Sequence, residues 1–307
     1  MSTVQAASAE HAGRRRGLLL RTRWGVTAAQ FLGPFCAAFV LFFLVPIGYA
    51  IYKSMFSTKR VGGIFGTPVQ VFSGLSQYKA VLTSTVFIDG ILRVVLYTAI
   101  WVPCVAIIAT VLALVLDATA PKIAGFFRTM FFLPYAVPSV IAAIMWGSLY
   151  TPAVSPMKDF GLDINFLGSG LVLPSIANIG IWASTGFYVI LVTTALTSIP
   201  HEVFEAARVD GASDWKVAWS IKFPLIRPTI VMSMVLAIIW TLQLFTEPTV
   251  LHSLSPAVTT DYTPTMMAYD TLTGGNFSFA AAISVTLAAA GLVISLAFIR
   301  IARRVAQ

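Results

Sequence analysis

Long runs without a charged residue dominate the chain. Six of them are apolar and long enough to be candidates for crossing a bilayer, which takes a helix of about 20 residues. They cover residues 28–52, 94–116, 129–151, 174–196, 229–246 and 277–299. Polar positions fall between these runs and do not alternate with apolar ones inside them. The pattern therefore predicts an all-α integral membrane protein with about six transmembrane helices.

Proline and glycine interrupt several of the predicted spans. Ordinary kinks are one interpretation, because neighbouring helices in a membrane can bond the carbonyl groups that a proline leaves free. The other interpretation is that bent helices create a cavity or a gate. The residues concerned are Pro34, Pro46, Pro103, Pro134, Pro138 and Gly186.

Basic residues are unevenly distributed between the two sides that six spans define. Both chain ends and the loops 117–128 and 197–228 share one side, and together they hold fourteen of the 20 lysines and arginines. Cytoplasmic loops carry such an excess, so both termini are predicted to be cytoplasmic. The net charge of +8 then reflects topology, and we do not expect nucleic acid as a partner.

Composition agrees with a multi-pass protein of the cell membrane, in contact with lipid. The chain is 58% hydrophobic and 10% charged, with a mean hydropathy of +0.86. No loop is long enough to fold as a soluble domain. We therefore expect a basic cytoplasmic tail over 1–27, one transmembrane domain over 28–304 and a short tail over 305–307.

The motifs of several enzyme classes are missing from the sequence. There is no Gly-x4-Gly-Lys-Ser/Thr loop for ATP, and no nucleophile elbow of the Gly-x-Ser-x-Gly type. The three histidines, His11, His201 and His252, are far apart and none is near a cysteine, so no metal site is expected. The sequence gives no support for an enzyme on this chain.

One polar segment, "EAARVDGASDWKVAWSIKFPLIRP" at 205–228, stands between two apolar runs. Pro200 suits a helix start, and Gly211 suits a helix stop with positive φ. Ser213 can cap a second helix, which Pro224 and Pro228 would end. The segment is therefore predicted to be two short amphipathic helices bent at Gly211. The expected apolar faces carry Val203, Phe204 and Ala207 in the first helix, and Trp215, Ala218 and Trp219 in the second.

Two roles for this elbow remain open on physical grounds. It could be an interfacial hairpin whose tryptophans anchor in lipid headgroups. It could instead be a docking element, because Ala206 and Ala207 would let a partner's backbone approach closely. A rigid elbow of this kind would transmit force into the spans on either side of it.

The segment resembles the EAA signature of permease subunits of bacterial ATP-binding-cassette importers. The matching positions are Glu205, Ala206, Ala207, Asp210, Gly211, Ile221 and Pro224, whereas Phe223 replaces the usual leucine. Further stretches, "FFRTMFFLPYAVPSVIAAIMWGSLY" (126–150), "LFTEPTVL" (244–251) and "FSFAAAISV" (277–285), resemble the carbohydrate-uptake branch of this family, of the maltose, glycerol-phosphate and lactose type. In that branch they resemble the first of the two permease subunits. The likeness extends from about residue 30 to 304.

This resemblance implies a type I importer fold and a set of partners. Those partners are a second permease subunit, two cytoplasmic ATPases and an extracytoplasmic solute-binding protein that delivers a sugar. ATP and Mg would be held by the ATPases, so no cofactor is expected on this chain. The elbow, over 198–228, would dock in the ATPase cleft through Glu205, Ala206, Ala207, Asp210, Gly211, Ala212 and Pro224.

Polar and aromatic side chains of the fourth and fifth spans are the expected lining of a solute path. A sugar binds through hydrogen bonds to its hydroxyls and through stacking of its apolar face on aromatic rings. Trp240, Gln243 and Glu247 are spaced to share one helix face. Alternatively, Gln243 is only a packing contact between helices and Glu247 a satisfied boundary acid. The predicted lining is Ser184, Phe187, Tyr188, Trp240, Gln243, Thr246 and Glu247.

Three other functions compete with a sugar permease. The same machine could carry a polyamine, an amino acid or a phosphonate, with Glu247 contacting a cation. A secondary transporter would need an intramembrane ion-coupling site and usually internal repeats, and neither is visible. A secondary transporter or a purely structural scaffold would also leave the elbow without a purpose.

Overall fold

The computed structural model describes residues 30–61 and 67–305, and the chain divides into two compact units, Met1–Lys53 and Ser54–Gln307. A helix begins at Gln30 and ends at Ser54, the first residue of the second unit, in agreement with the first predicted span. The basic tail predicted over 1–27 lies outside the described residues. So do residues 306 and 307 of the predicted C-terminal tail.

The first helix adapts to Pro46 by a local change of hydrogen bonding. A π-helical turn, η1 (Val40–Leu44), precedes α2 (Val45–Ser54), and the Val45 N–H bonds the Val40 carbonyl. That bond reaches one residue further back than an α-helical bond would. Proline has no N–H to donate, so a wider turn before it keeps the helix continuous.

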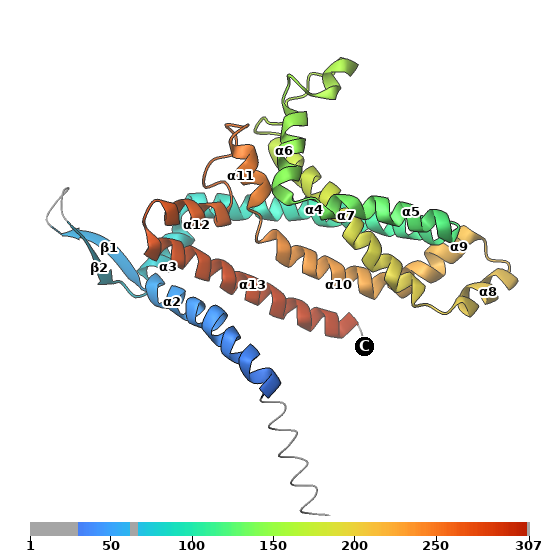
Figure 1. Cartoon of the computed structure of the whole chain (residues 1–307), viewed down its shortest axis with the longest axis horizontal. Helices are drawn as coiled ribbons and strands as arrows, with labels where there is room; N and C mark the ends of the chain where they lie inside the picture. Colours follow the sequence, from blue (N-terminus) through green and yellow to red (C-terminus); the bar gives the residue numbers. More distant parts are fainter. Residues whose placement is uncertain (1–29, 62–66, 306–307) are drawn as a thin grey trace, which may run out of the picture. The chain divides into compact units, whose positions relative to one another are not determined.

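Four further helices of the second unit are long and apolar enough to cross a membrane. They are α4 (Thr85–Asp117), α7 (Val172–Thr197), the continuous helix Asp214–Thr241 and α13 (Phe277–Val305). α4 and α7 pack along each other and are joined by α10 (Phe223–Thr241), the larger part of Asp214–Thr241 (Figure 1). Trp101, Val105 and Val189 are buried in the core between these helices.

The third predicted span, 129–151, is not one continuous helix. α5 (Pro121–Phe132) continues into the 3₁₀ turn η2 (Leu133–Ala136), and α6 (Ser139–Tyr150) then leaves at an angle of 92° (Figure 1). Val137 at the break is extended, with ψ of 128°, as is favoured before a proline such as Pro138. The described residues thus contain five candidate spans, or six with the bent pair counted as one, which confirms the prediction of about six.

A β-hairpin in the loop after the first helix was not predicted from the sequence. β1 (Phe56–Val61) pairs antiparallel with β2 (Thr67–Phe72), and α3 (Ser76–Thr83) follows. Phe56 lies opposite Phe72, and the two rings meet edge to face with centroids 5.6 Å apart. Residues 62–66, between the two strands, lie outside the described residues. The fold is therefore helical in its spans, with one short hairpin between them.

The fifth span ends earlier than the apolar run suggests. α10 stops at Thr241, and after a turn the chain forms α11 (Thr246–His252), so residues 229–246 do not form one helix. α11 packs against α6, where Gly147 leaves room for the side chains of Leu251 and Leu254. Two shorter elements, η3 (Pro156–Phe160) and α12 (Pro264–Thr273), complete the connections.

Candidate functional site

The polar segment forms an elbow with a glycine at its corner, as predicted. α8 (His201–Val209) ends in a double hydrogen-bonded turn, in which the Ala212 N–H bonds the Ala207 carbonyl (2.9 Å) and the Gly211 N–H bonds the Arg208 carbonyl (3.0 Å). This arrangement requires a left-handed residue after the helix. Gly211 fills that position with φ of +80°.

The second arm differs from the prediction, because neither Pro224 nor Pro228 ends it. Ser213 does cap α9 (Asp214–Val217), accepting a bond from the Lys216 N–H (3.4 Å). The helix then passes through a π-helical turn, η4 (Ala218–Lys222), directly into α10. The wide turn lets the Phe223 N–H reach the Ala218 carbonyl just before Pro224, as in the first helix before Pro46. The elbow is thus continuous with a membrane span.

Most of the predicted coupling residues lie at the surface of the elbow. Ala207 and Ala212 are partly buried, whereas the others are exposed: Glu205, Ala206, Asp210, Gly211 and Pro224. The elbow therefore presents small and acidic side chains at its corner.

The apolar faces of the elbow are only partly those predicted. Phe204, 6% exposed, and Val217 are the buried residues of the two arms, while Val203 is exposed. Trp215 is 74% exposed and its ring contacts that of Trp219 at an angle of 56°, so the predicted tryptophan face is largely exposed. The helical spacing correctly indicated apolar residues in the second arm, but Val217 is the buried one, in place of the predicted tryptophans.

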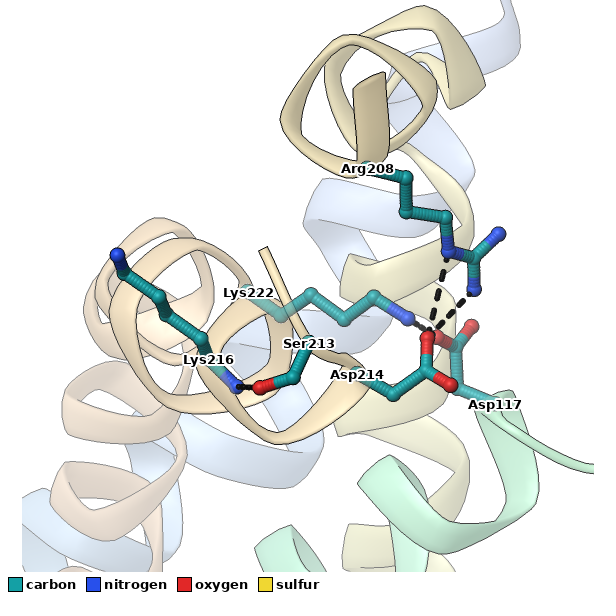
Figure 2. Close-up of polar contacts among 6 residues, drawn as sticks. All are labelled: Asp117, Arg208, Ser213, Asp214, Lys216 and Lys222. Carbon is teal, nitrogen blue, oxygen red and sulfur yellow. Dashed lines mark hydrogen bonds and ion pairs between the residues drawn. The ribbon is translucent and has the colours of Figure 1, made fainter. Parts of the chain in front are cut away.

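Two ion pairs involve residues of the elbow, one across its corner and one between the elbow and α4 (Figure 2). Arg208 in α8 pairs with Asp214 in α9, at 3.0 Å between Nη2 and Oδ1, and bridges the corner. Lys222 in η4 pairs with Asp117, the last residue of α4. The Lys222 ammonium also lies 4.7 Å from the centre of the Phe204 ring, in a cation–π contact.

A cavity of about 550 Å³ opens among the membrane helices. Its wall comes from α4, from the break between η2 and α6, from α7, and from the segment joining α10 to α11. The lining residues are Tyr97, Trp101, Tyr135, Ala136, Val137, Pro138, Ser139, Gly180, Ala183, Ser184, Trp240, Thr241, Gln243, Leu244, Thr246 and Glu247.

Five of the seven predicted path residues line this cavity, and two lie behind its wall. Ser184, Trp240, Gln243, Thr246 and Glu247 are at the surface of the cavity. Phe187 stacks on Tyr135 with centroids 5.0 Å apart, and the buried Tyr188 meets Trp101 edge to face at 6.1 Å. These two rings support lining residues and are not themselves in the lining.

The reason given for grouping Trp240, Gln243 and Glu247 was wrong, although all three reach the same cavity. They were expected on one face of a continuous helix. Instead Trp240 is in the last turn of α10, Gln243 lies in the following turn, and Glu247 is in the first turn of α11. A carboxylate there is favoured by the positive end of the helix dipole. The turn, and not helical periodicity, brings the three side chains to one place.

The sequence did not identify the lining residues of the second span. Tyr97 and Trp101 stack one helical turn apart in α4, with centroids 6.1 Å apart. They reach the cavity because α7 has a glycine opposite them, where a Cβ on Gly180 would come within 2.5 Å of the Tyr97 hydroxyl and 2.7 Å of Trp101 Nε1. The i, i+4 aromatic pair was visible in the sequence, but nothing local linked it to the fourth span.

The chemistry of the wall suits the binding of a polar solute. The lining contains aromatic rings together with one carboxylate, one amide and several hydroxyls. The buried Nε1 of Trp101 is a donor without a hydrogen-bond partner among the described residues. Within residues 30–61 and 67–305, no group of three histidine, cysteine, aspartate or glutamate residues could hold a metal ion. Such a surface can exchange hydrogen bonds and ring contacts with a polar solute.

Much of this sequence aligns with the sequences of transport permeases. It is 29% identical over 218 residues to the diacetylchitobiose uptake system permease protein NgcF of Streptomyces coelicolor, an alignment that covers 65% of this chain and 60% of NgcF. It is 26% identical over 306 residues to the trehalose transport system permease protein SugA of Mycobacterium tuberculosis, covering 98% and 96% of the two chains.

Solved structures show the same fold. A chain of a bacterial ABC transporter involved in the import of the acidic polysaccharide alginate matches with a TM-score of 0.79 and 24% identity, over 95% of this chain and all of that one. The MetNI methionine ABC transporter matches more weakly, with a TM-score of 0.53 over 72% of this chain. These structures confirm the predicted type I permease fold. Residues 73–307 match the family model described as the binding-protein-dependent transport system inner membrane component, and the chain belongs to that family of membrane transport subunits.

Proposed function

We propose that this chain is the membrane subunit of an ATP-driven importer whose solute is a carbohydrate. The observation that carries the proposal is the composition of the 550 Å³ cavity, which combines the rings of Tyr97, Trp101 and Trp240 with the amide of Gln243 and nearby hydroxyls. Aromatic rings stack on the apolar faces of sugars, and amides and hydroxyls bond their hydroxyl groups. The names of the relatives, which include carriers of diacetylchitobiose, trehalose and alpha-glucosides, support the same class of solute.

The proposed assembly contains a second permease subunit, two ATPases that hold ATP and Mg, and an extracytoplasmic solute-binding protein. ATP is hydrolysed on the partner subunits and not on this chain. The exposed small and acidic corner around Gly211 docks in the ATPase cleft, with Glu205 and Ala206 on its N-terminal side. Both termini and the elbow are cytoplasmic. The distribution of basic residues and the surface position of the coupling residues support this arrangement.

Glu247 favours a second candidate, an importer of a cationic solute such as a polyamine. Its carboxylate lies at the cavity among rings that could also contact a cation. The two candidates differ in what Glu247→Gln does. A sugar importer keeps most of its uptake with the neutral amide, whereas an importer of a cation loses the charge that binds its solute.

The experiment uses the complete complex in proteoliposomes, together with its proposed solute-binding protein. That binding protein is first titrated with neutral sugars, acidic sugars, polyamines and amino acids. We expect a sugar to bind, to stimulate ATP hydrolysis by the complex and to be taken up. Binding and uptake of a polyamine or an amino acid, with no response to any sugar, would contradict the proposed solute class.

A further inference from the structure

One ion pair joins the elbow to a membrane helix that is distant in sequence. Lys222 and Asp117 are 105 positions apart, and their side chains are only 12% and 18% exposed. The Arg208–Asp214 pair, by contrast, lies within the elbow and has side chains 59% and 80% exposed. Exposed pairs contribute little to stability, whereas breaking a shielded pair leaves one charge without its counterion.

Asp117 stands where an acidic residue is unfavourable without a partner. It is the last residue of α4, and the negative end of a helix dipole repels a carboxylate. Lys222 supplies the compensating charge at this site. Lys222, a residue of the elbow, therefore offsets the unfavourable charge of Asp117. The ion pair holds the elbow and the end of α4 in one relative position.

Lys222 also contacts the other arm of the elbow. Its ammonium lies over the ring of Phe204, the buried residue of α8, while its backbone belongs to η4 (Figure 2 shows it reaching Asp117). One side chain thus touches α8, η4 and α4. A displacement of α8 moves the ring on which the ammonium rests, and a displacement of η4 moves the lysine itself.

α4 extends from the Lys222–Asp117 pair to the cavity. Trp101 lies 16 residues before Asp117, which corresponds to about 24 Å along a helix. The Thr98 hydroxyl is bonded to the Thr241 hydroxyl at 2.8 Å, which ties the middle of α4, beside the cavity, to the end of α10. α4 is therefore held to the elbow helix at two places, at its last residue by Lys222 and near its middle by Thr241.

We propose that the Lys222–Asp117 pair is a positioning contact that transmits movement of the elbow to α4, and thereby to the wall of the cavity. The covalent chain links the elbow only to α7 and α10. The ion pair adds a third connection, to the helix that carries Tyr97 and Trp101. This inference rests on the proposed function, since it assumes that the elbow receives movement from an ATPase.

The test compares Asp117→Asn, Lys222→Met and the double variant in the complete complex in proteoliposomes. Lys122→Gln is the matched control, because it removes one exposed basic residue near the same end of α4 without touching the pair. Three quantities are measured: retention of the ATPase, ATP hydrolysed, and solute taken up per ATP. We expect the ATPase to be retained and hydrolysis to continue, while uptake per ATP falls about tenfold, within the usual range of coupling between sites.

The double variant shows whether the two residues act through one contact. We expect its loss of uptake per ATP to be no larger than that of the worse single variant, because either single substitution already breaks the ion pair. Lys222→Arg, which keeps the charge, should retain uptake per ATP. Normal uptake per ATP in both single variants, multiplied losses in the double variant, or loss of the ATPase from the complex would each overturn the proposal.

A readout that needs no solute separates this inference from the proposed function. Ser139→Cys, at the cavity, is introduced after Cys36 and Cys104 have been replaced by serine. ATP should change the labelling rate of Cys at 139 in the otherwise unaltered protein and not in Asp117→Asn. If labelling responds to ATP but no sugar is taken up, the solute class is wrong while the ion pair keeps its role. Equal responses with and without Asp117→Asn overturn the ion-pair proposal alone.

Discussion

Gly211 and Gly186 are each required for a different physical reason. Gly211 has positive φ, and a Cβ there would meet nothing within 4 Å in this chain. Gly186 has ordinary helical geometry, but a Cβ on it would come within 2.0 Å of the Phe131 carbonyl oxygen. The first is required by backbone conformation at an exposed corner, and the second by close contact between α7 and the end of α5.

Gly211→Asp is expected to leave insertion and pairing with the partner permease intact, and to weaken docking of the ATPase or uncouple hydrolysis from uptake. A side chain at positive φ costs about 1 kcal/mol, and a carboxylate beside Asp210 and Asp214 adds repulsion. A loss of about 1.4 kcal/mol is tenfold in a binding equilibrium. The measurement is co-purification of the ATPase together with uptake.

Gly211→Asn is the matched control for this variant. Asparagine has nearly the same shape as aspartate, tolerates the left-handed conformation and carries no charge. It should therefore dock better than Gly211→Asp. Full ATPase retention and full uptake in Gly211→Asp would mean that the elbow only anchors the protein at the membrane surface.

Gly186→Ala is expected to destabilise the membrane domain. The added methyl group has no room against the backbone of Phe131 and Phe132, and overpacking of this kind typically costs about 1–3 kcal/mol. The thermal unfolding midpoint of the purified complex should fall. Gly125→Ala in α5, where a Cβ meets nothing within 4 Å, should leave the midpoint unchanged or raise it slightly. Equal midpoints for the two variants would show that α7 and α5 can separate at little cost.

At the scale of elements, the sequence predicted what depends on local apolarity and missed what depends on contact between distant segments. A long uncharged run is enough to specify α7 or α13, because a membrane helix satisfies its own backbone. The elbow was also predictable, since a capping serine and a glycine stop act within a few residues. The hairpin depends on pairing between two strands, and its alternating Val69 and Val71 were too short a pattern to predict it.

The residues of the candidate site likewise include some that could be predicted from the sequence and some that could not. Gln243 and Glu247 were predicted because polar residues at the end of an apolar span are conspicuous in the sequence. Trp101 was missed because its place in the cavity depends on a glycine of another helix, 79 positions later. Prolines 134 and 138 were recognised as possible kinks, but they did not reveal the 92° angle of the break or the place of Ser139 in the wall.

Gln243→Leu is expected to impair uptake while the complex still assembles. Gln243 is exposed at the cavity, in the turn after α10, and leucine keeps its approximate size but removes its hydrogen-bonding groups. Loss of one such bond to a solute reduces uptake about three- to tenfold at limiting solute concentration. Uptake and subunit co-purification are measured together, with Gln243→Asn as the variant that keeps the amide. If assembly fails and the residual complex transports normally, Gln243 is a packing contact between subunits.

At the scale of the whole molecule, the decisive question is which end of the helix bundle meets the ATPases. The elbow, the end of α4 at Asp117 and the Lys222 contact lie together at one end of the second unit. The segment 253–263, between α11 and α12, lies beside the other half of α4, where Arg93 donates a hydrogen bond to the Tyr262 carbonyl. If basic residues set the orientation, the elbow end is cytoplasmic.

Single cysteines test this orientation in intact cells. In a background without Cys36 and Cys104, a membrane-impermeant thiol reagent added from outside should label Thr260→Cys and leave Ser220→Cys unlabelled, both positions being exposed in the structure. After permeabilisation both should react, which controls for accessibility of the thiol itself. Labelling of Ser220→Cys from outside would place the elbow on the extracytoplasmic side. The elbow could then no longer contact a cytoplasmic ATPase, and the proposed coupling through Lys222 and Asp117 would fail with it.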